Sequence, residues 1–211
     1  MAEASTAYPL SLSIDYPDRK LNRLTTFFRA FTVIPIAIIL GLISGAVLSW
    51  AAEDGRSYQY AATGLVLLPT VLMLLFRQKY PRWWFDWNLA LIRFITRVDT
   101  YFMLLRDEYP STDEEQAVRL DIPYPNAKEE LNRWLPLVKW IMAIPHYIVL
   151  FFLAIAAWVV TIIAWFAILF TGRYPKDMFD FVVGVFRWSL RVTAYALLLT
   201  TDCYPPFRFS D

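Results

Sequence analysis

The sequence predicts an all-α membrane protein composed of two tandem repeats. Of its 211 residues, 58% are hydrophobic and 18% are charged, against about 45–50% and about 25% in an average soluble domain. It also contains long stretches without formal charge and an internal similarity between its halves. We expect each repeat to form a transmembrane helical hairpin followed by an interfacial amphipathic helix. A short two-stranded β-ribbon is expected between the repeats.

Charge and cysteine content exclude several classes of function. The net charge of +1 provides no long-range field that would attract nucleic acid. Cys203 is the single cysteine and His146 the single histidine. The sequence therefore offers neither an internal disulfide nor a Cys/His cluster, and we predict no metal site and no cofactor.

Repeat 1 is assigned to residues 1–112. Its first expected element is a strand over residues 10–16, where apolar side chains alternate with other residues. Two uncharged runs at residues 30–52 and 58–76 are long enough to cross about 30 Å of hydrocarbon. Residues 83–105 are expected to form the interfacial helix.

Repeat 2 is assigned to residues 113–211, with a strand at 118–124 and an interfacial helix at 177–199. The apolar region between them contains 33 consecutive residues without a formal charge, apart from a possible one on the histidine. This run is too long for one upright helix and short of two full spans. We predict a compressed membrane hairpin over residues 134–172. One long tilted helix, kinked at Pro145, is the alternative.

Matches in the same order along both halves indicate a tandem duplication. Residues 21–23 (Leu-Asn-Arg) recur at 131–133, and the basic residue Arg29 recurs as Lys139 at the same offset of 110. Downstream, residues 76–105 align with residues 170–199, with 11 identities among 30 positions. Arg29 and Lys139 are interpreted as anchors at the membrane entrance, with the Lys139 side chain extending to the interface.

The orientation of the copies leads to a specific expectation for the two strands. Two parallel-topology repeats are most simply related by a twofold axis along the membrane normal. Segments near such an axis meet their counterparts running in the opposite direction. We therefore expect residues 10–16 and 118–124 to pair as an antiparallel ribbon on the cytoplasmic face.

The final helix of each copy contains the most specific pattern of side chains. Spacings of 7, 4 and 4 place an acid, two arginines and a tyrosine on one stripe. The residues are Asp86, Arg93, Arg97 and Tyr101 in the first copy, and Asp180, Arg187, Arg191 and Tyr195 in the second. The stripes could bind phospholipid phosphates or an acidic partner. Alternatively, they could pair with these aspartates or with helix C-terminal carbonyls and hold the copies together.

The distribution of basic residues predicts the topology. Nineteen of the 20 Lys and Arg residues lie outside the expected hairpin tips. By the positive-inside rule, both termini are cytoplasmic and residues 53–57 are outside, in a multi-pass protein.

The second copy resembles a bacterial integral-membrane family that is known as a domain of unknown function, numbered four thousand three hundred and eighty-nine. The similarity is carried by residues 132–140, 143–149, 165–175 and 179–188. It covers residues 118–207 well and residues 8–110 as a diverged copy. This resemblance implies a location in the bacterial inner membrane, and it implies no catalytic residues.

The chain contains no nucleophile elbow, zinc-protease helix, P-loop or dinucleotide-binding motif. We therefore expect a non-enzymatic inner-membrane protein, either an accessory subunit of a larger complex or a lipid-contacting scaffold. Membrane phospholipids and other membrane-protein subunits are its expected partners, and nucleic acid is not. A small transporter or channel component is the alternative, and a lipid-modifying enzyme is a weaker one.

Overall fold

The computed structural model describes most of the chain. The described residues are 8–17, 19–44, 47–51, 57–61, 67–112, 114 and 116–210. Four positions of the outward tip that was expected at residues 53–57 lie outside this set, and so do residues 1–7 and 211 at the ends of the chain.

The described chain is mostly helical. Its helices are α1 (Arg23–Phe27), α2 (Arg29–Thr32), α3 (Ile34–Ser44), α4 (Leu67–Leu72), α5 (Arg82–Phe102), α6 (Lys139–Met142), α7 (Ile144–Thr171) and α8 (Lys176–Thr193). Two π-helical turns, η1 (Met73–Arg77) and η3 (Ala194–Leu198), and a short 3₁₀ turn, η2 (Leu135–Leu137), complete the helical elements. The strands are β1 (Ser11–Ile14), β2 (Val47–Ala51), β3 (Ser57–Ala61) and β4 (Val118–Asp121).

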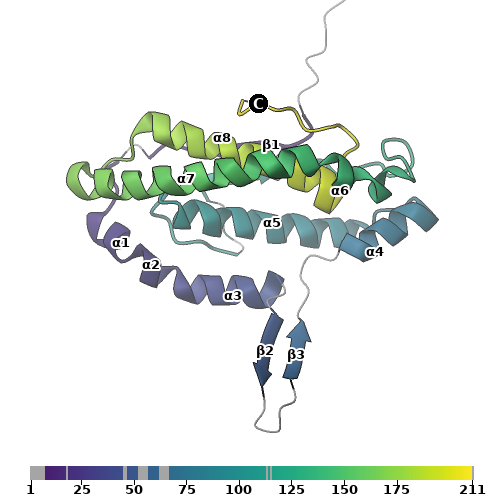
Figure 1. Cartoon of the computed structure of the whole chain (residues 1–211), viewed down its shortest axis with the longest axis horizontal. Coiled ribbons are helices and arrows are strands. Elements are labelled where there is room, and N and C mark those ends of the chain that lie inside the picture. The colour runs from purple at the N-terminus through teal and green to yellow at the C-terminus, as the bar shows by residue number, and fades with distance from the viewer. Residues whose placement is uncertain are drawn as a thin grey trace, which may run out of the picture.

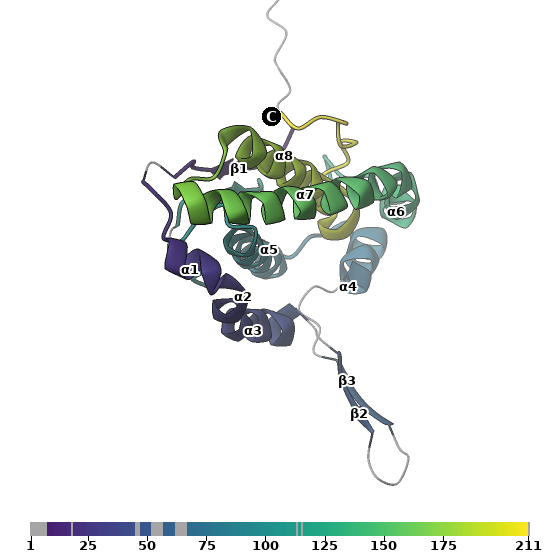
Figure 2. The same ribbon diagram turned by 60° about the vertical axis from the view of Figure 1, so that its left-hand side comes forward.

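The long helices pack in layers. In Figure 1, α7 and α8 form an antiparallel pair and α3 packs on the far side of α5. Helix α5 is seen nearly end-on in Figure 2, whereas α7 stays extended, so α5 crosses α7. The C-terminal segment lies near α8, whereas the β2–β3 hairpin projects from the opposite side, next to α3 (Figure 2). The molecule therefore has a side that carries β1 and the C-terminal segment, and an opposite side toward α3.

The ribbon between β1 and β4 is antiparallel, which confirms the expected pairing. Its register places Leu12 opposite Leu120 and Ser13 opposite Arg119. The inward-facing side chains of both strands are buried, whereas Ser11, Ser13, Arg119 and Asp121 point outward and are exposed. Because side chains alternate across a strand, one face of the ribbon packs on the helices and the other is polar.

The hairpin expected at residues 134–172 is wrong, because α7 is one continuous helix of 28 residues. It begins at Ile144, with Pro145 in its first turn. The backbone N–H that proline lacks would have no partner within the helix at this position, so the proline does not disturb the helix. It ends at Gly172, whose φ of +75° closes the helix with a left-handed residue. Between these two signals the sequence contains neither Gly nor Pro, so nothing in it favours a turn. The alternative of one long helix is the observed arrangement.

The spans expected at residues 30–52 and 58–76 are also wrong as continuous helices. Helix α3 ends at Ser44, and β2 pairs with β3 as an antiparallel hairpin. The sequence Asp54-Gly55 lies between these strands, and this dipeptide strongly favours a hairpin turn. A run without charged residues is compatible with a strand as well as with a helix, so its length alone does not predict a helical span.

The helices expected at residues 83–105 and 177–199 are present as α5 and as α8 continued by η3. Their position relative to a membrane stays a prediction. Two helical segments of the described chain are long and apolar enough to cross a membrane, namely Ile144–Thr171 and Lys176–Leu198. The first is largely exposed and the second is mostly buried by the rest of the protein.

Candidate functional site

Two of the four stripe arginines bind the β-ribbon. Arg93 donates from Nε to the Leu120 carbonyl at 2.8 Å, and Arg187 donates from Nε and Nη2 to the Leu12 carbonyl, both at 3.3 Å. Leu12 and Leu120 are directly opposite each other in the ribbon. The two guanidinium groups therefore bind equivalent carbonyls on the two strands. A two-stranded ribbon has two open edges, and charged donors at these carbonyls close part of each edge.

The other two stripe arginines hold segments outside the ribbon. Arg97 donates to the Ser111 carbonyl at 2.8 Å. Arg191 is fully buried and donates to the carbonyls of Arg208 and Ser210 at 3.1 and 2.6 Å. These bonds fix the chain that leads toward β4 and the C-terminal segment, respectively. The stripe arginines thus make contacts within the protein. Their acceptors are carbonyls of the strands and of irregular segments, and not the two stripe aspartates or the carbonyls at helix C-termini.

The two stripe aspartates lie at the surface. Asp86 is 4.0 Å from Arg82, and both side chains are well exposed. Asp180 is exposed on α8. The spacing that places these acids on the arginine stripe thus does not bring them into the ribbon contacts.

Arg29 lies in a pocket within the protein, and its side chain is only 3% exposed. Its guanidinium pairs with Asp107, donates to the carbonyls of Tyr101 and Arg106 at 3.0 and 2.7 Å, and lies 4.0 Å from the Tyr101 ring centre. Asp107 also accepts a 2.6 Å bond from the Asn22 backbone N–H. Burial lowers the pKa of Arg29, and the charge of Asp107 partly opposes that shift.

Lys139 occupies a second pocket of the same construction. Its ammonium lies 2.6 Å from Asp202, donates to the Thr201 carbonyl at 2.8 Å, and lies 5.1 Å from the Tyr195 ring centre. Asp202 accepts a 2.6 Å bond from the Asn132 backbone N–H. The side chain of Lys139 is 0% exposed, so its expected extension to the interface is wrong. A carboxylate within the protein neutralises the charge instead.

The two pockets share further details beyond their ion pairs. Residues 21–38 and 131–148 have the same sequence of buried and exposed positions. Tyr101 contacts the Tyr109 ring at 5.5 Å, and Tyr195 contacts the Tyr204 ring at 5.7 Å. The sequence offset changes from 94 to 95 between these tyrosine pairs. The second half therefore has one more residue between its two tyrosines than the first half has. The π-helical turn η3 lies at this point, and a π-helical turn can accommodate one inserted residue within a helix.

Asp107 and Asp202 were missed by the sequence reasoning. Both lie just beyond the aligned block and are separated by 95 residues, like the Tyr-Pro pairs that follow them. Extending the comparison across the inserted residue would have found them. His146 is buried and accepts a 3.0 Å bond from Trp188 Nε1. It stacks on Phe207, with ring centres 4.0 Å apart.

The outward face of the ribbon borders a cavity of about 530 Å³. Arg93, Arg97, Arg119 and Asp121 contribute charged groups to its wall. Arg93 lies 3.4 Å from Asp121, and their side chains are 40% and 77% exposed. Arg93 thus lines this cavity and also holds the ribbon, and Arg97 lines the cavity beside it.

A third missed residue, Asp99, lines a small cavity of about 150 Å³ between α5 and α8. Thr96, Ser189 and Thr193 contribute hydroxyl groups, and the other lining side chains are apolar. Asp99 itself is exposed, and desolvation by these neighbouring groups raises the pKa of its carboxyl to about 6. Asp99 is separated from Arg97 by two positions, so it lies off the stripe on which the sequence reasoning concentrated.

Comparison with known proteins gives one match. Residues 134–209 match the family model described as Domain of unknown function (DUF4389), as a single copy. The match includes α6, α7, α8 and η3, together with the pocket residue Asp202. No curated protein and no solved structure gives a match. The similarity therefore concerns the C-terminal part of the chain and carries no assigned activity.

Removing the carboxylate beside Lys139 is expected to destabilise the protein strongly. Asp202→Asn leaves a buried ammonium without its counter-charge, which costs on the order of 3–5 kcal/mol. The double variant Lys139→Met/Asp202→Asn removes both charges and should recover much of that loss. Thermal unfolding in detergent measures both effects. Equal destabilisation by the two variants would contradict the proposed coupling between these side chains.

Asp99 should make stability depend on pH. Its pKa is about 6 in the folded protein against a usual 3.8, so the folded state binds more protons between these values. Stability should therefore fall as the pH rises from about 4 to about 6. Asp99→Asn should unfold at a higher temperature than the wild type at pH 7.5, and at nearly the same temperature at pH 4. A constant difference across this range would refute the assignment.

Proposed function

We propose that this chain is a non-enzymatic integral membrane protein that acts as a lipid-contacting scaffold or as an accessory subunit of a larger membrane complex. One observation carries the proposal. The outward side chains of α2, α3, α6 and α7, here called the apolar face, are large and hydrophobic. On α7 alone they include Ile148, Phe151, Phe152, Ile155, Val159 and Ile162, each about half exposed or more.

The apolar face is incompatible with a permanent contact with water. Arg29 and Lys139 are buried, and among the described side chains of these four helices no Asp, Glu, Lys or Arg is exposed. Exposed apolar patches of more than a few hundred Å² mark sites of contact with membranes or proteins. Phospholipids and other membrane-protein subunits are therefore the partners that we propose.

The non-enzymatic assignment is supported by how the charged groups are used. The stripe arginines donate to backbone carbonyls, and the buried cations are paired within their pockets. We further infer that the chain arose by tandem duplication, since the two pockets are built from corresponding residues in the same order along the chain. The resemblance to a bacterial membrane family supports a location in the bacterial inner membrane. The distribution of basic residues supports cytoplasmic termini.

Introducing charge on the apolar face should weaken membrane attachment without unfolding the core. Phe151→Asp/Ile155→Asp changes two exposed side chains of α7. We expect a smaller share of this variant than of the wild type to sediment with membranes after alkaline carbonate washing. Ser13→Asp/Ser11→Asp, on the polar side of the ribbon, is the matched control and should behave as the wild type does.

Equal losses in both variants would contradict the role of the apolar face. Purification in mild detergent then separates the two forms of the proposal. A stoichiometric protein partner supports the accessory subunit, whereas reproducible phospholipid alone supports the scaffold.

A further inference from the structure

We infer that α7 lies parallel to the membrane plane, with the apolar face immersed in one leaflet and the β1–β4 ribbon in water. This inference rests on the proposed membrane function and specifies how the protein meets the lipid. It replaces the multi-pass arrangement, in which α7 would cross the bilayer.

The neighbours of α7 make a transmembrane orientation costly. Helix α8 packs antiparallel against α7, so both helices would be upright together (Figure 1). Arg93 and Arg187 lie near the middle of α5 and α8 and hold the ribbon there. A spanning α7 would therefore place the ribbon close to the depth of the bilayer centre. Charged side chains and open strand edges are disfavoured at that depth.

The outward side of the ribbon has the character of a water-facing surface. Ser11, Ser13, Arg119 and Asp121 are exposed there, next to the 530 Å³ cavity. The inward side chains of the ribbon are buried in the main core. The described parts of both chain ends also lie on this side, because Tyr8 donates to the Arg191 and Cys203 carbonyls. The surface over the ribbon is thus polar, whereas the apolar face is hydrophobic.

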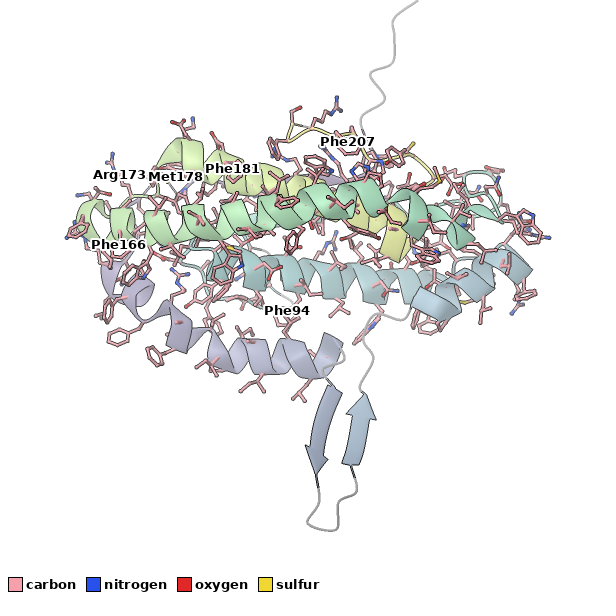
Figure 3. All side chains as sticks on the ribbon, in the orientation of Figure 1. Phe94, Phe166, Arg173, Met178, Phe181 and Phe207 are labelled. Carbon is pink, nitrogen blue, oxygen red and sulfur yellow. The ribbon has the colours of Figure 1, made fainter. Side chains whose placement is uncertain are left out.

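The length and flanks of α7 fit an in-plane helix. Its 28 residues extend over about 42 Å, which exceeds the roughly 30 Å of hydrocarbon. Basic side chains are exposed near both ends of the helix. At its C-terminal end are Arg173, which Figure 3 labels near Phe166, and Arg23, which donates to the Phe170 carbonyl at 2.9 Å. Toward its N-terminal end, Arg133 donates to Gln78 at 3.1 Å.

This charge distribution selects a lipid leaflet as the occupant of the apolar face. Anionic headgroups could pair with basic residues at both ends of α7 while acyl chains contact the exposed side chains between them. In this orientation the cavity lined by Arg93 and Arg97 is open to the aqueous phase, on the ribbon side of the molecule.

Depth-dependent fluorescence quenching tests the orientation. In a Cys203→Ser background, a fluorophore is attached to Ile148→Cys, Val159→Cys or Phe170→Cys, which lie on one stripe of α7 and sample both of its ends and its middle. The protein is reconstituted in vesicles of phosphatidylethanolamine and phosphatidylglycerol that contain lipids spin-labelled at a shallow or a deep acyl position. An in-plane helix gives equal shallow-to-deep quenching ratios at all three positions. Ser13→Cys on the ribbon is the matched control and should escape quenching.

The outcomes distinguish the orientation from membrane association itself. Deep quenching at position 159 with shallow quenching at positions 148 and 170 would overturn the in-plane orientation, and so would quenching at position 13. Either result would leave the proposed membrane function intact. Failure of the wild-type protein to associate with the vesicles would overturn both proposals. Oriented circular dichroism of the unmodified protein gives a second reading, because in-plane helices retain a strong negative 208 nm band that spanning helices lose.

Discussion

Hydrogen bonds from arginine side chains to backbone carbonyls are the interaction on which the arrangement of this protein depends. A two-stranded ribbon is marginally stable in water and exposes unpaired groups along both edges. Here Arg93 and Arg187 reach the ribbon from α5 and α8 and bind the carbonyls of Leu120 and Leu12. Each helix is thereby tied to a strand that is distant in sequence. Because β1 and β4 pair with each other, these bonds also connect the two halves of the chain.

The buried cations extend the same principle to the ends of the helices. Arg29 and Lys139 precede the first long apolar segment of each half, and each pairs with an aspartate that follows the last helix. Each ion pair thus joins the beginning of one half of the chain to its end. Burying a charge is costly, and these pockets offset that cost with a counter-charge, carbonyl acceptors and a tyrosine ring. Membrane lipid is not needed to neutralise either cation.

The sequence predicted those parts of the fold that depend on periodicity and internal similarity. Alternation in the two short segments gave the ribbon, and the stripe spacing placed Arg93 and Arg187 on the correct helix faces. The sequence did not indicate which carbonyls these arginines would bind, because backbone acceptors have no sequence signature. The length of an uncharged run also could not distinguish one long helix from a hairpin in α7. The local turn signal at Asp54-Gly55 carried more information than the hydrophobic length of the run around it.

Hydrogen exchange at the ribbon tests most directly whether the arginines hold the fold or serve lipid headgroups. In Arg93→Gln/Arg187→Gln, the account predicts faster exchange of the amides in β1 and β4, a lower unfolding temperature and an unchanged content of bound phospholipid. Arg82→Gln, an exposed arginine at the start of α5, is the matched control and should change none of these quantities. Loss of bound phospholipid with unchanged protection of both strands would contradict the account.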